Sequence, residues 1–392
     1  MKIAILSTMN LPTPAVAGGA VEMLTTNLLD ENEKKSNIKF DVYTMYDERI
    51  NENQYKNTKI IPIRVNFIER LYQKVRNLLN RIIGKRPVYN ILYQKAAKLL
   101  LKQKYDKIVV ENNMFIYNLI KDKTNTEMIY HMHNDFNESD KTPENYIGIV
   151  NSASRIITVS NYIKNRCNNV IKTNKIDVLY NAIDDKLYIP ECASTFRDRY
   201  NINKDDIVIG YSGRITEEKG ILELVKAIKS INTKKSIKLL IVGTQWYSEL
   251  KRDNYIKKIE QEMETIKDKV IFTGYIQYEN MPSIYNTMDI LVIPTIIEEA
   301  FGCVAIEGMA MGKPLVVTKS GALPEIVKEN FGFIINKDHK LVENMSKSIK
   351  KLVENESLRK GFGEKARIEF IENKNYHKDQ YYKNFINILN IE

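Results

Sequence analysis

Short apolar runs rich in β-branched residues alternate with helical patterns along the whole chain. This alternation is typical of parallel sheets whose strands are connected by helices, and it predicts an α/β fold with two groups of strands. The first group comprises residues 2–7, 40–44, 107–111, 128–133, 155–159 and 176–180. The second group comprises residues 207–212, 238–242, 270–273, 290–294, 314–318 and 332–335. Each group is sufficient for one Rossmann-like sheet.

The strand pattern breaks between residues 184 and 204, around Pro190. A chain of 392 residues also exceeds the ~250–300 residues that a single hydrophobic core serves. We therefore predict an N-terminal domain, residues 1–185, and a C-terminal domain, residues 186–373, which face each other across a cleft. Ligands of open α/β sheets bind beyond the carboxyl ends of the strands, so the chemistry is expected in the loops at those ends.

The excess of basic residues lies in one segment. Residues 70–104 contain ten of the 59 lysines and arginines and no acidic residue, and without them 49 basic residues face 49 acidic ones. The ten are Arg70, Lys74, Arg76, Arg81, Lys85, Arg86, Lys95, Lys98, Lys102 and Lys104. Apolar residues recur in the same segment at helical spacing, namely Leu71, Val75, Leu78, Leu79, Ile82 and Ile83. The pattern predicts an amphipathic helix flanked by cations.

Two interpretations of this helix are open. It packs on its own domain as a surface helix, or its cations attract an anionic membrane surface, which contributes ~1 kcal/mol for each cation near the lipid. Nucleic acid is not an expected partner, because no zinc-finger pattern or RNP-like aromatic strand accompanies the charge.

The three cysteines, Cys167, Cys192 and Cys303, are too far apart for a disulfide framework or a CxxC metal site, which indicates a reducing compartment. The N-terminus lacks a signal-peptide core, and no run approaches the ~20 apolar residues of a membrane helix. We therefore expect a cytoplasmic protein, and peripheral attachment to the inner leaflet of the plasma membrane is left open.

Gly18 and Gly19 follow the first strand and precede a helical pattern that begins near Leu24. Paired glycines at a strand-to-helix turn let the backbone approach an anion, and the helix supplies unpaired N–H groups. An ordinary tight turn has the same pattern. The GxGxxG fingerprint is missing, which counts against an NAD or FAD enzyme.

A second glycine-flanked turn carries two cations. The strand at 207–212 leads into Gly213 and Arg214, and Lys219 with Gly220 opens the next helix. A guanidinium fork and an ammonium in one loop suit a diphosphate. The alternative is a pair of surface ion pairs with Glu217 or Glu218.

The third cluster joins two carboxylates. Glu299 lies in the loop after the strand at 290–294, and Glu307 lies eight positions later in the predicted helix. This spacing corresponds to two helical turns and predicts that both carboxylates face the cleft. The intervening amides of Ala300, Phe301 and Gly302 can donate to sugar hydroxyls or phosphate.

Together these residues resemble the GT-B glycosyltransferases of family 4, the retaining enzymes that transfer sugars from nucleotide diphosphosugars. The resemblance covers nearly the whole chain and rests on the three clusters above, on Gly274-Tyr275-Ile276, and on the segment from Val178 to Asp184. In that segment Ala182 replaces the glycine that is usual in the family, and Ala300 stands where the family often has proline. In this fold the last helix, here within residues 374–392, commonly packs back on the first domain.

The resemblance implies a role for each cluster. Arg214 and Lys219 would hold the donor diphosphate, with help from the backbone at Gly18 and Gly19. Glu307 would accept hydrogen bonds from the ribose hydroxyls. Two further sets are implied: Glu299 with the amides of Ala300, Phe301 and Gly302 for the transferred sugar, and the backbone of Gly274, Tyr275 and Ile276 for the base.

The family also places a histidine near the anomeric carbon. His131 and His133 are the candidates, and His133 fits better because it lies at a strand end, where a loop begins. The His-x-His pair also suggests a metal site. The other histidines, His339 and His377, however, lie in predicted helices near the C-terminus. The Asp-x-Asp motif of metal-dependent glycosyltransferases does not occur in the chain. We predict no metal and no cofactor, and His131 is interpreted as a strand residue.

The resulting prediction is a metal-independent, retaining glycosyltransferase. Its donor would be a nucleotide diphosphosugar, a UDP-sugar by the family's majority, and its acceptor a glycan, polyprenyl-linked in view of the basic helix. Capsule, exopolysaccharide or cell-wall glycan assembly would use such a reaction. The alternatives are a nucleotide-sugar 2-epimerase of the same architecture and a non-catalytic membrane adaptor.

Overall fold

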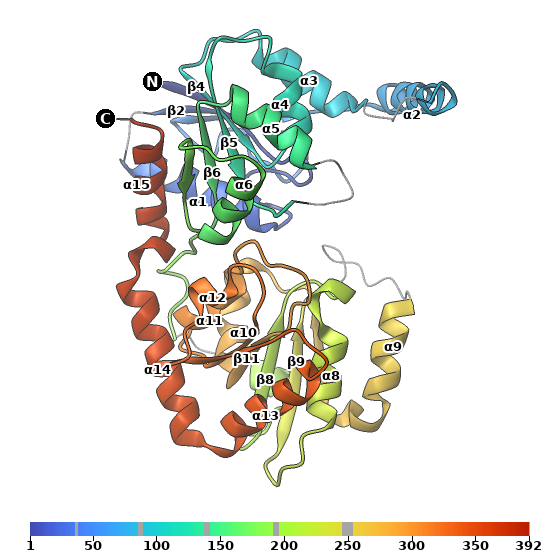
Figure 1. The fold of residues 1–392 in the computed structure, drawn as a ribbon, viewed down its shortest axis with the longest axis vertical. Helices are drawn as coiled ribbons and strands as arrows, with labels where there is room; N and C mark the ends of the chain where they lie inside the picture. The colour runs from blue at the N-terminus through green and yellow to red at the C-terminus, as the bar shows by residue number, and fades with distance from the viewer. Residues whose placement is uncertain (36–37, 85–88, 137–141, 191–195, 245–253, 392) are drawn as a thin grey trace. The chain divides into compact units, whose positions relative to one another are not determined.

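The computed structural model describes the chain except for residues 36–37, 85–88, 137–141, 191–195, 245–253 and 392. It divides into two compact units (Figure 1). The first unit comprises residues 1–159, 163–179 and 382–392, and the second comprises residues 160–162 and 180–381. Lys85, Arg86 and Cys192 lie outside the described residues.

The first unit is built on a seven-stranded sheet with the strand order β3-β2-β1-β4-β5-β6-β7, and each neighbouring pair is parallel. Its strands are β1 (Lys2–Leu6), β2 (Lys39–Met45), β3 (Thr58–Ile63), β4 (Lys107–Glu111), β5 (Glu127–Met132), β6 (Arg155–Thr158) and β7 (Ile176–Val178). Strand β1, in the interior of the sheet, is apolar and buried along most of its length, as parallel strands covered on both faces are. This arrangement confirms the predicted parallel sheet.

Strand β3 was not predicted from the sequence. Its sequence is Thr-Lys-Ile-Ile-Pro-Ile, and Pro62 has no N–H to donate to a sheet. The structure tolerates Pro62 because β3 lies at the edge of the sheet and pairs only with β2. Because of this proline, the strand pattern of the sequence did not predict β3.

The helices of the first unit include α1 (Ala20–Lys35), α2 (Phe67–Ile82), α3 (Ile91–Leu100), α4 (Met114–Ile120), α5 (Thr142–Ser152) and α6 (Asn161–Val170). The last helix, α15 (Lys378–Ile388), reaches this unit from Tyr382 onward. The Tyr382 hydroxyl donates to Asn32 Oδ1 of α1 at 3.1 Å, and Phe385 is fully buried. The end of the chain is thus part of the first unit's core.

The second unit contains a six-stranded parallel sheet with the order β10-β9-β8-β11-β12-β13. Its strands are β8 (Ile207–Ser212), β9 (Ile237–Val242), β10 (Val270–Gly274), β11 (Ile290–Ile293), β12 (Leu315–Thr318) and β13 (Gly332–Ile335). Its helices include α7 (Phe196–Arg199), α8 (Ile221–Lys229), α9 (Asn254–Met263), α10 (Met281–Thr287), α11 (Cys303–Ala310), α12 (Leu323–Ile326), α13 (Leu341–Glu354) and α14 (Glu356–Glu372). Both sheets have the Rossmann-like form that the sequence predicted.

Helix α2 stands at the periphery of the first unit (Figure 1). None of its residues, all of which the structure describes, is buried. Ile68 is 76% exposed, Leu71 51% and Ile82 71%. Its polar residues instead face α3, since Gln73 Oε1 accepts from Ile91 N at 2.7 Å and Asn77 Nδ2 donates to Tyr89 O at 3.1 Å. The apolar stripe is therefore not packed against its own unit. No helix among the described residues is long and apolar enough to cross a bilayer.

Candidate functional site

The loops at the carboxyl ends of β8, β9 and β10 lie against one another. Gly243 N donates to Gly274 O at 3.0 Å, and Gly213 N donates to Val242 O at 3.0 Å. Gly243 has φ +134°, and a Cβ there would lie 2.0 Å from Gly213 O. Only glycine fits at position 243. Gly243 thus contacts both Gly274, which belongs to the predicted base-binding backbone, and Gly213, which directly precedes Arg214.

The two predicted diphosphate ligands have carboxylate partners in the structure. Arg214 Nη2 lies 2.7 Å from Glu218 Oε1, and Lys219 Nζ lies 2.6 Å from Glu299 Oε2. The first contact is the local pair that the sequence offered as an alternative. The second joins residues from two separate motifs, so the structure makes one site of the second and third clusters.

Gly220 allows these two motifs to approach. It has φ +69°, and a Cβ there would lie 2.0 Å from Pro294 O at the end of β11. The approach is also fixed by a backbone hydrogen bond from Ile296 N to Glu218 O at 2.8 Å. Lys219 is consequently held next to the Glu299 loop by main-chain contacts, independently of its own ion pair.

Glu299 lies in the loop before α11 and Glu307 lies on α11, as the sequence predicted, so two continuous helical turns do not connect the two residues. Gly302, with φ +102°, precedes α11 and turns the chain, so Glu299 belongs to the loop while Glu307 lies in the second turn of α11. The loop is anchored because Glu299 O accepts from Ala322 N at 2.8 Å. The left-handed residue at 302 interrupts the helical geometry that the spacing suggested.

The amides of Ala300, Phe301 and Gly302 donate to no protein acceptor within the described chain. The Phe301 side chain is 2% exposed and its ring lies 5.9 Å from that of Tyr180. Phe301 therefore anchors the loop with its side chain and leaves its backbone N–H available, and the predicted role of these three amides in ligand binding stays a prediction.

Glu307 receives a hydrogen bond from the Tyr285 hydroxyl at 2.6 Å, a contact that the sequence did not indicate. Burial raises the pKa of the Glu307 carboxyl, and the hydrogen bond from Tyr285 opposes part of that rise. A buried carboxylate is stabilised by each further donor it acquires. Glu307 is thus suited to accept hydrogen bonds from hydroxyl groups.

Gly18 and Gly19 have φ values of +78° and +103° and lie directly before α1. A Cβ at Gly19 would lie 2.2 Å from Glu22 Oε2, and the Thr8 hydroxyl donates to the Glu22 carboxylate. The turn therefore requires glycine at position 19. It belongs to the first unit, and its contribution to a diphosphate stays a prediction.

A buried cluster in the first unit surrounds His133. Glu111, at the end of β4, pairs in register with His131 of β5, so Glu111, His131 and His133 share one face of the sheet. Glu111 Oε2 lies 2.7 Å from His133 Nε2 and 2.9 Å from His131 Nδ1. The exposed fractions of the three residues are 2%, 1% and 6% in chain order. Glu111 was not among the predicted site residues, although the sequence shows a carboxylate at the end of an apolar strand.

The protonation states in this cluster follow from its burial. Burial and the neighbouring His131 lower the pKa of His133 to about 4, although Glu111 acts in the opposite direction. Burial would raise the pKa of Glu111, but the two histidines outweigh it and hold that pKa below its ordinary range. At neutral pH an anionic Glu111 thus accepts the proton of His133 Nε2. His133 Nδ1, which has no hydrogen-bond partner in the described part of the chain, remains an acceptor.

The other two histidines were predicted to lie in helices, and that prediction was wrong. His339 lies in a turn, and His377 forms an isolated bridge with Ile183. The ligand atoms of Glu111, His131 and His133 all lie within 4.8 Å of one another, so this set could hold a divalent cation. The sequence predicted no metal, and that stays a prediction.

Comparisons with known proteins agree with these features. The model of the family "Glycosyl transferases group 1" matches residues 193–369. The lipopolysaccharide 1,2-N-acetylglucosaminetransferase of Salmonella typhimurium is 30% identical over 263 residues, which are 62% of this chain and 67% of that protein. The chain belongs to the glycosyl transferases group 1.

Two further proteins are similar to this group 1 glycosyltransferase. The capsular polysaccharide biosynthesis glycosyltransferase CapM of Staphylococcus aureus is 33% identical over 231 residues, 57% of this chain and 58% of that protein. The structure of Anabaena HepE in complex with UDP and glucose matches with a TM-score of 0.76 and 18% identity, covering 100% of this chain and 99% of that chain. The likeness in structure confirms the predicted GT-B fold.

Lowering the pH from 7 to 5 is expected to destabilise this glycosyltransferase through His133. An unfolded histidine has a pKa near 6.5, whereas the pKa of folded His133 is about 4. The unfolded chain therefore binds more protons between these values, and stability is lost as the pH falls, by about 2 kcal/mol at pH 5. The lowered pKa of Glu111 affects stability only at pH values below this range. Urea unfolding at both pH values measures the effect.

The control is the variant His133→Gln, which lacks the titrating group and should lose less stability on acidification than the wild type. His339→Gln removes an exposed histidine and should behave like the wild type. The same pH dependence in His133→Gln and in the wild type would contradict the assignment of a neutral, buried His133.

Proposed function

We propose that this glycosyltransferase transfers a sugar, with retention at the anomeric carbon, from a UDP-sugar to a polyprenyl-linked glycan acceptor. The contact between Lys219 Nζ and Glu299 Oε2 carries the proposal, because it joins a cationic loop and a carboxylate loop at the carboxyl edge of one sheet. Relatives that act on lipopolysaccharide and capsular polysaccharide support a role in capsule, exopolysaccharide or cell-wall glycan assembly. The UDP in the HepE complex supports the choice of nucleotide.

In this proposal the donor diphosphate takes the place of the two carboxylates. Arg214 and Lys219 exchange Glu218 and Glu299 for phosphate oxygens, so the site carries compensating charge both before and after binding. The freed Glu299 then accepts hydrogen bonds from the sugar hydroxyls. The amides of Ala300, Phe301 and Gly302 donate to the same ligand.

The nucleoside would occupy the remaining parts of this edge. Glu307 accepts from the ribose hydroxyls, and each new donor offsets the cost of its buried charge. The backbone of Gly274, Tyr275 and Ile276 receives the base. The Tyr275 side chain, 45% exposed, lies at the surface next to that backbone.

The transfer step requires charge stabilisation on the leaving group. The bond between the anomeric carbon and the phosphate oxygen breaks, and a bond from that carbon to the acceptor oxygen forms on the same face. The acceptor proton passes to the departing phosphate. Arg214 and Lys219 neutralise the diphosphate as it leaves, which is the part a metal plays in enzymes with an Asp-x-Asp motif. His133 would lie near the anomeric carbon and accept a hydrogen bond at Nδ1.

The acceptor would bind the first unit, and α2 would bring the enzyme to an anionic membrane. The apolar stripe of α2 is exposed and is flanked by cations, and amphipathic helices bind lipid interfaces through this combination. In this proposal residues 70–104 attach the enzyme to the inner leaflet of the plasma membrane, and nucleic acid is no partner.

One sugar nucleotide is expected to stabilise the enzyme in the presence of EDTA. At 100 times its Kd a ligand adds about 2.7 kcal/mol, which raises Tm by about 5–10 °C for a domain of this size. The panel comprises UDP-glucose, UDP-galactose, their N-acetyl forms and GDP-mannose, and slow donor hydrolysis is measured in parallel. The variant Lys219→Ala serves as the control and should show no shift.

The other outcomes identify the alternatives. An epimerised sugar nucleotide in the product would identify a 2-epimerase, and silence across the panel with intact vesicle binding would favour a membrane adaptor. Stabilisation that EDTA abolishes would overturn metal independence and direct attention to Glu111, His131 and His133.

A further inference from the structure

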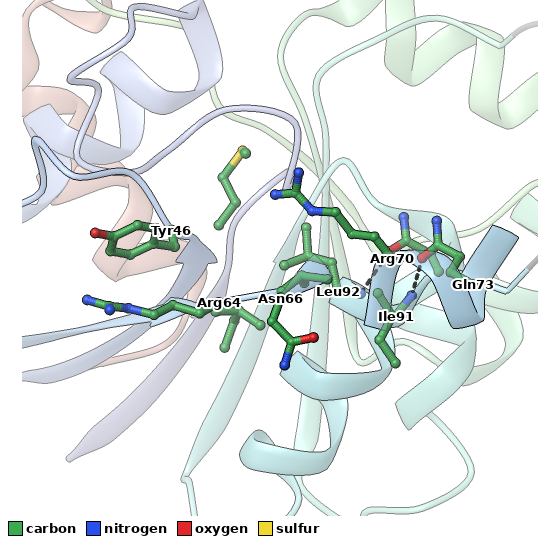
Figure 2. A pocket seen from close by; sticks show the side chains of 11 residues that line it. Tyr46, Arg64, Asn66, Arg70, Gln73, Ile91 and Leu92 are labelled. Atoms are coloured by element: carbon green, nitrogen blue, oxygen red, sulfur yellow. Dashed lines mark hydrogen bonds between the residues drawn. The ribbon is translucent and has the colours of Figure 1, made fainter. Parts of the chain in front are cut away.

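A cavity of about 610 Å³ lies in the first unit, where β2 and β3 end beside α2 and α3 (Figure 2). Met45 and Tyr46 from the end of β2 line one side, and Ile91 and Leu92 from the start of α3 line another. The carboxyl ends of parallel strands are where open α/β sheets bind ligands. The cavity is therefore at a ligand-binding edge, but it is separate from the donor site of the second unit.

Two arginines supply the charge of this cavity. Arg64 follows β3 and Arg70 lies on α2, and Figure 2 shows their side chains extending from these different elements. The Arg64 guanidinium stacks over the Tyr46 ring, 4.1 Å from its centroid. Neither guanidinium has a carboxylate or other hydrogen-bond acceptor within the described chain, and no described carboxylate lines the cavity. Both cations are available to an anionic ligand.

The side-chain oxygens of the three amide residues around the cavity are already occupied. Gln73 Oε1 accepts from Ile91 N at 2.7 Å, and Asn90 Oδ1 accepts from Leu92 N at 3.0 Å. Asn66 Oδ1 accepts from Glu69 N at 2.9 Å in the capping box of α2. The first amides of α3 are thus paired, and Arg64 and Arg70 are the cationic groups of the lining.

The chemistry of the walls selects an amphiphilic anion. Met45, Ile63, Val65, Ile91 and Leu92 present an apolar surface, which free phosphate cannot use, whereas two unpaired guanidiniums disfavour a neutral lipid. Arginine forks match phosphate oxygens in geometry. A diphosphate joined to a hydrocarbon chain satisfies both parts of the lining.

With α2 at a membrane surface, as proposed above, the cavity would be at the level of the lipid phosphates. The helix presents its apolar stripe outward and its polar residues toward α3 and the cavity. A helix with side chains is about 10–12 Å across, and an interfacial helix buries its apolar face at the boundary between headgroups and acyl chains. The cavity, on the opposite side of α2, would then lie among the headgroups.

We propose that this cavity binds the diphosphate head and first isoprene units of the lipid-linked acceptor, with Arg64 and Arg70 as the anion ligands. The inference rests on the proposed lipid-linked acceptor and assigns that acceptor a site. An ion pair between Glu69 of α2 and Lys95 of α3, 2.8 Å apart, joins the two helices beside the cavity.

The test uses farnesyl diphosphate as a probe in calorimetric titrations of the full chain. We expect binding by the wild type, and at least tenfold weaker binding of farnesol and of inorganic pyrophosphate, which each lack one part of the ligand. The double variant R64Q/R70Q should bind the probe about 100-fold more weakly, since each charge-assisted contact contributes about tenfold. The control K234Q/K235Q removes the same charge from exposed positions of the second unit and should change binding less than threefold, as expected for charges outside the contact.

Three results would overturn the assignment: no binding of farnesyl diphosphate by the wild type, equal binding of farnesol, or equal loss in both double variants. The donor panel separates this inference from the proposed function. Donor binding without binding of farnesyl diphosphate would refute the cavity alone. Binding of farnesyl diphosphate with a silent donor panel would refute the proposed transfer and leave the cavity as a lipid diphosphate site.

Discussion

Replacing Lys219 with alanine is expected to lower sugar transfer by at least about 100-fold while the protein remains folded. Lys219 Nζ lies 2.6 Å from Glu299 Oε2, and main-chain contacts of the neighbouring Gly220 hold it there. The proposed diphosphate leaves with negative charge that this ammonium would neutralise. Without it, the transition state loses a charge-assisted contact in a partly buried site, where such contacts are strongest.

Transfer to a glycan acceptor, measured as released UDP, gives the size of the effect. The matched control is Lys229→Ala, which removes a lysine of α8 that lies 3.2 Å from Glu262 and away from the loop. It should retain nearly full activity. Lys219→Arg restores the positive charge and should recover part of the loss, whereas Arg214→Ala should resemble Lys219→Ala.

The stability of each variant is measured by urea unfolding, and a change of about 1 kcal/mol is expected, since the loop backbone is held by other contacts. Full turnover in both Lys219→Ala and Arg214→Ala would remove the diphosphate assignment. A large loss of stability would instead assign the Lys219–Glu299 pair a structural role.

The second large effect is expected at the membrane. Replacing Arg70, Lys74 and Arg76 with glutamate should weaken binding to anionic vesicles at physiological salt by at least about 100-fold, because each cation near such a surface contributes about 1 kcal/mol. Sedimentation with vesicles of anionic lipid measures the effect, and vesicles of zwitterionic lipid show how much of it is electrostatic.

A matched control changes the same net charge elsewhere. Lys204, Lys234 and Lys235 are exposed on the second unit, and their replacement by glutamate should leave vesicle binding nearly unchanged. Ile68→Ser together with Leu79→Ser keeps the charge and should also weaken binding, since these side chains are 76% and 55% exposed and available to lipid. Equal binding by the wild type and the α2 glutamate variant would make the basic stripe an ordinary surface.

The predictable part of the fold was the part with local signals. Apolar runs marked the strands of the second sheet, including β8 and β11, and glycines marked the turns at Gly213 and Gly220. Strand β3 was not predicted because it contains Pro62. A proline is tolerated in a strand where the strand has a free edge. Whether a strand lies at an edge is a property of the sheet and not of the strand.

The same distinction applies to α2. Its spacing predicted an amphipathic helix, and the helix is present. The pattern alone left open which face would contact the protein. The structure shows the polar face toward α3 through Gln73 and Asn77, which leaves the apolar face exposed. Side-chain hydrogen bonds to a neighbouring helix decide that orientation, and periodicity does not encode them.

The candidate site was predicted as separate motifs. Arg214, Lys219, Glu299 and Glu307 were found from their residue types and spacing, but Lys219 and Glu299 were not expected to touch. Glu111 was overlooked because its importance arises from the register between β4 and β5, which sets it opposite His131. A carboxylate at a strand end is unremarkable until its neighbours are known.

The sequence by itself thus determined the α/β class, most strands, the glycine turns and the residue types that suit a nucleotide diphosphosugar. These depend on interactions between residues close in the chain, which periodicity and backbone preference express directly. Only the tertiary structure decided that the Lys219 and Glu299 loops meet, that Glu111 lies next to both histidines, and that Arg64 and Arg70 share a cavity. Such contacts depend on strand order and register, which are set by the packing of the whole unit.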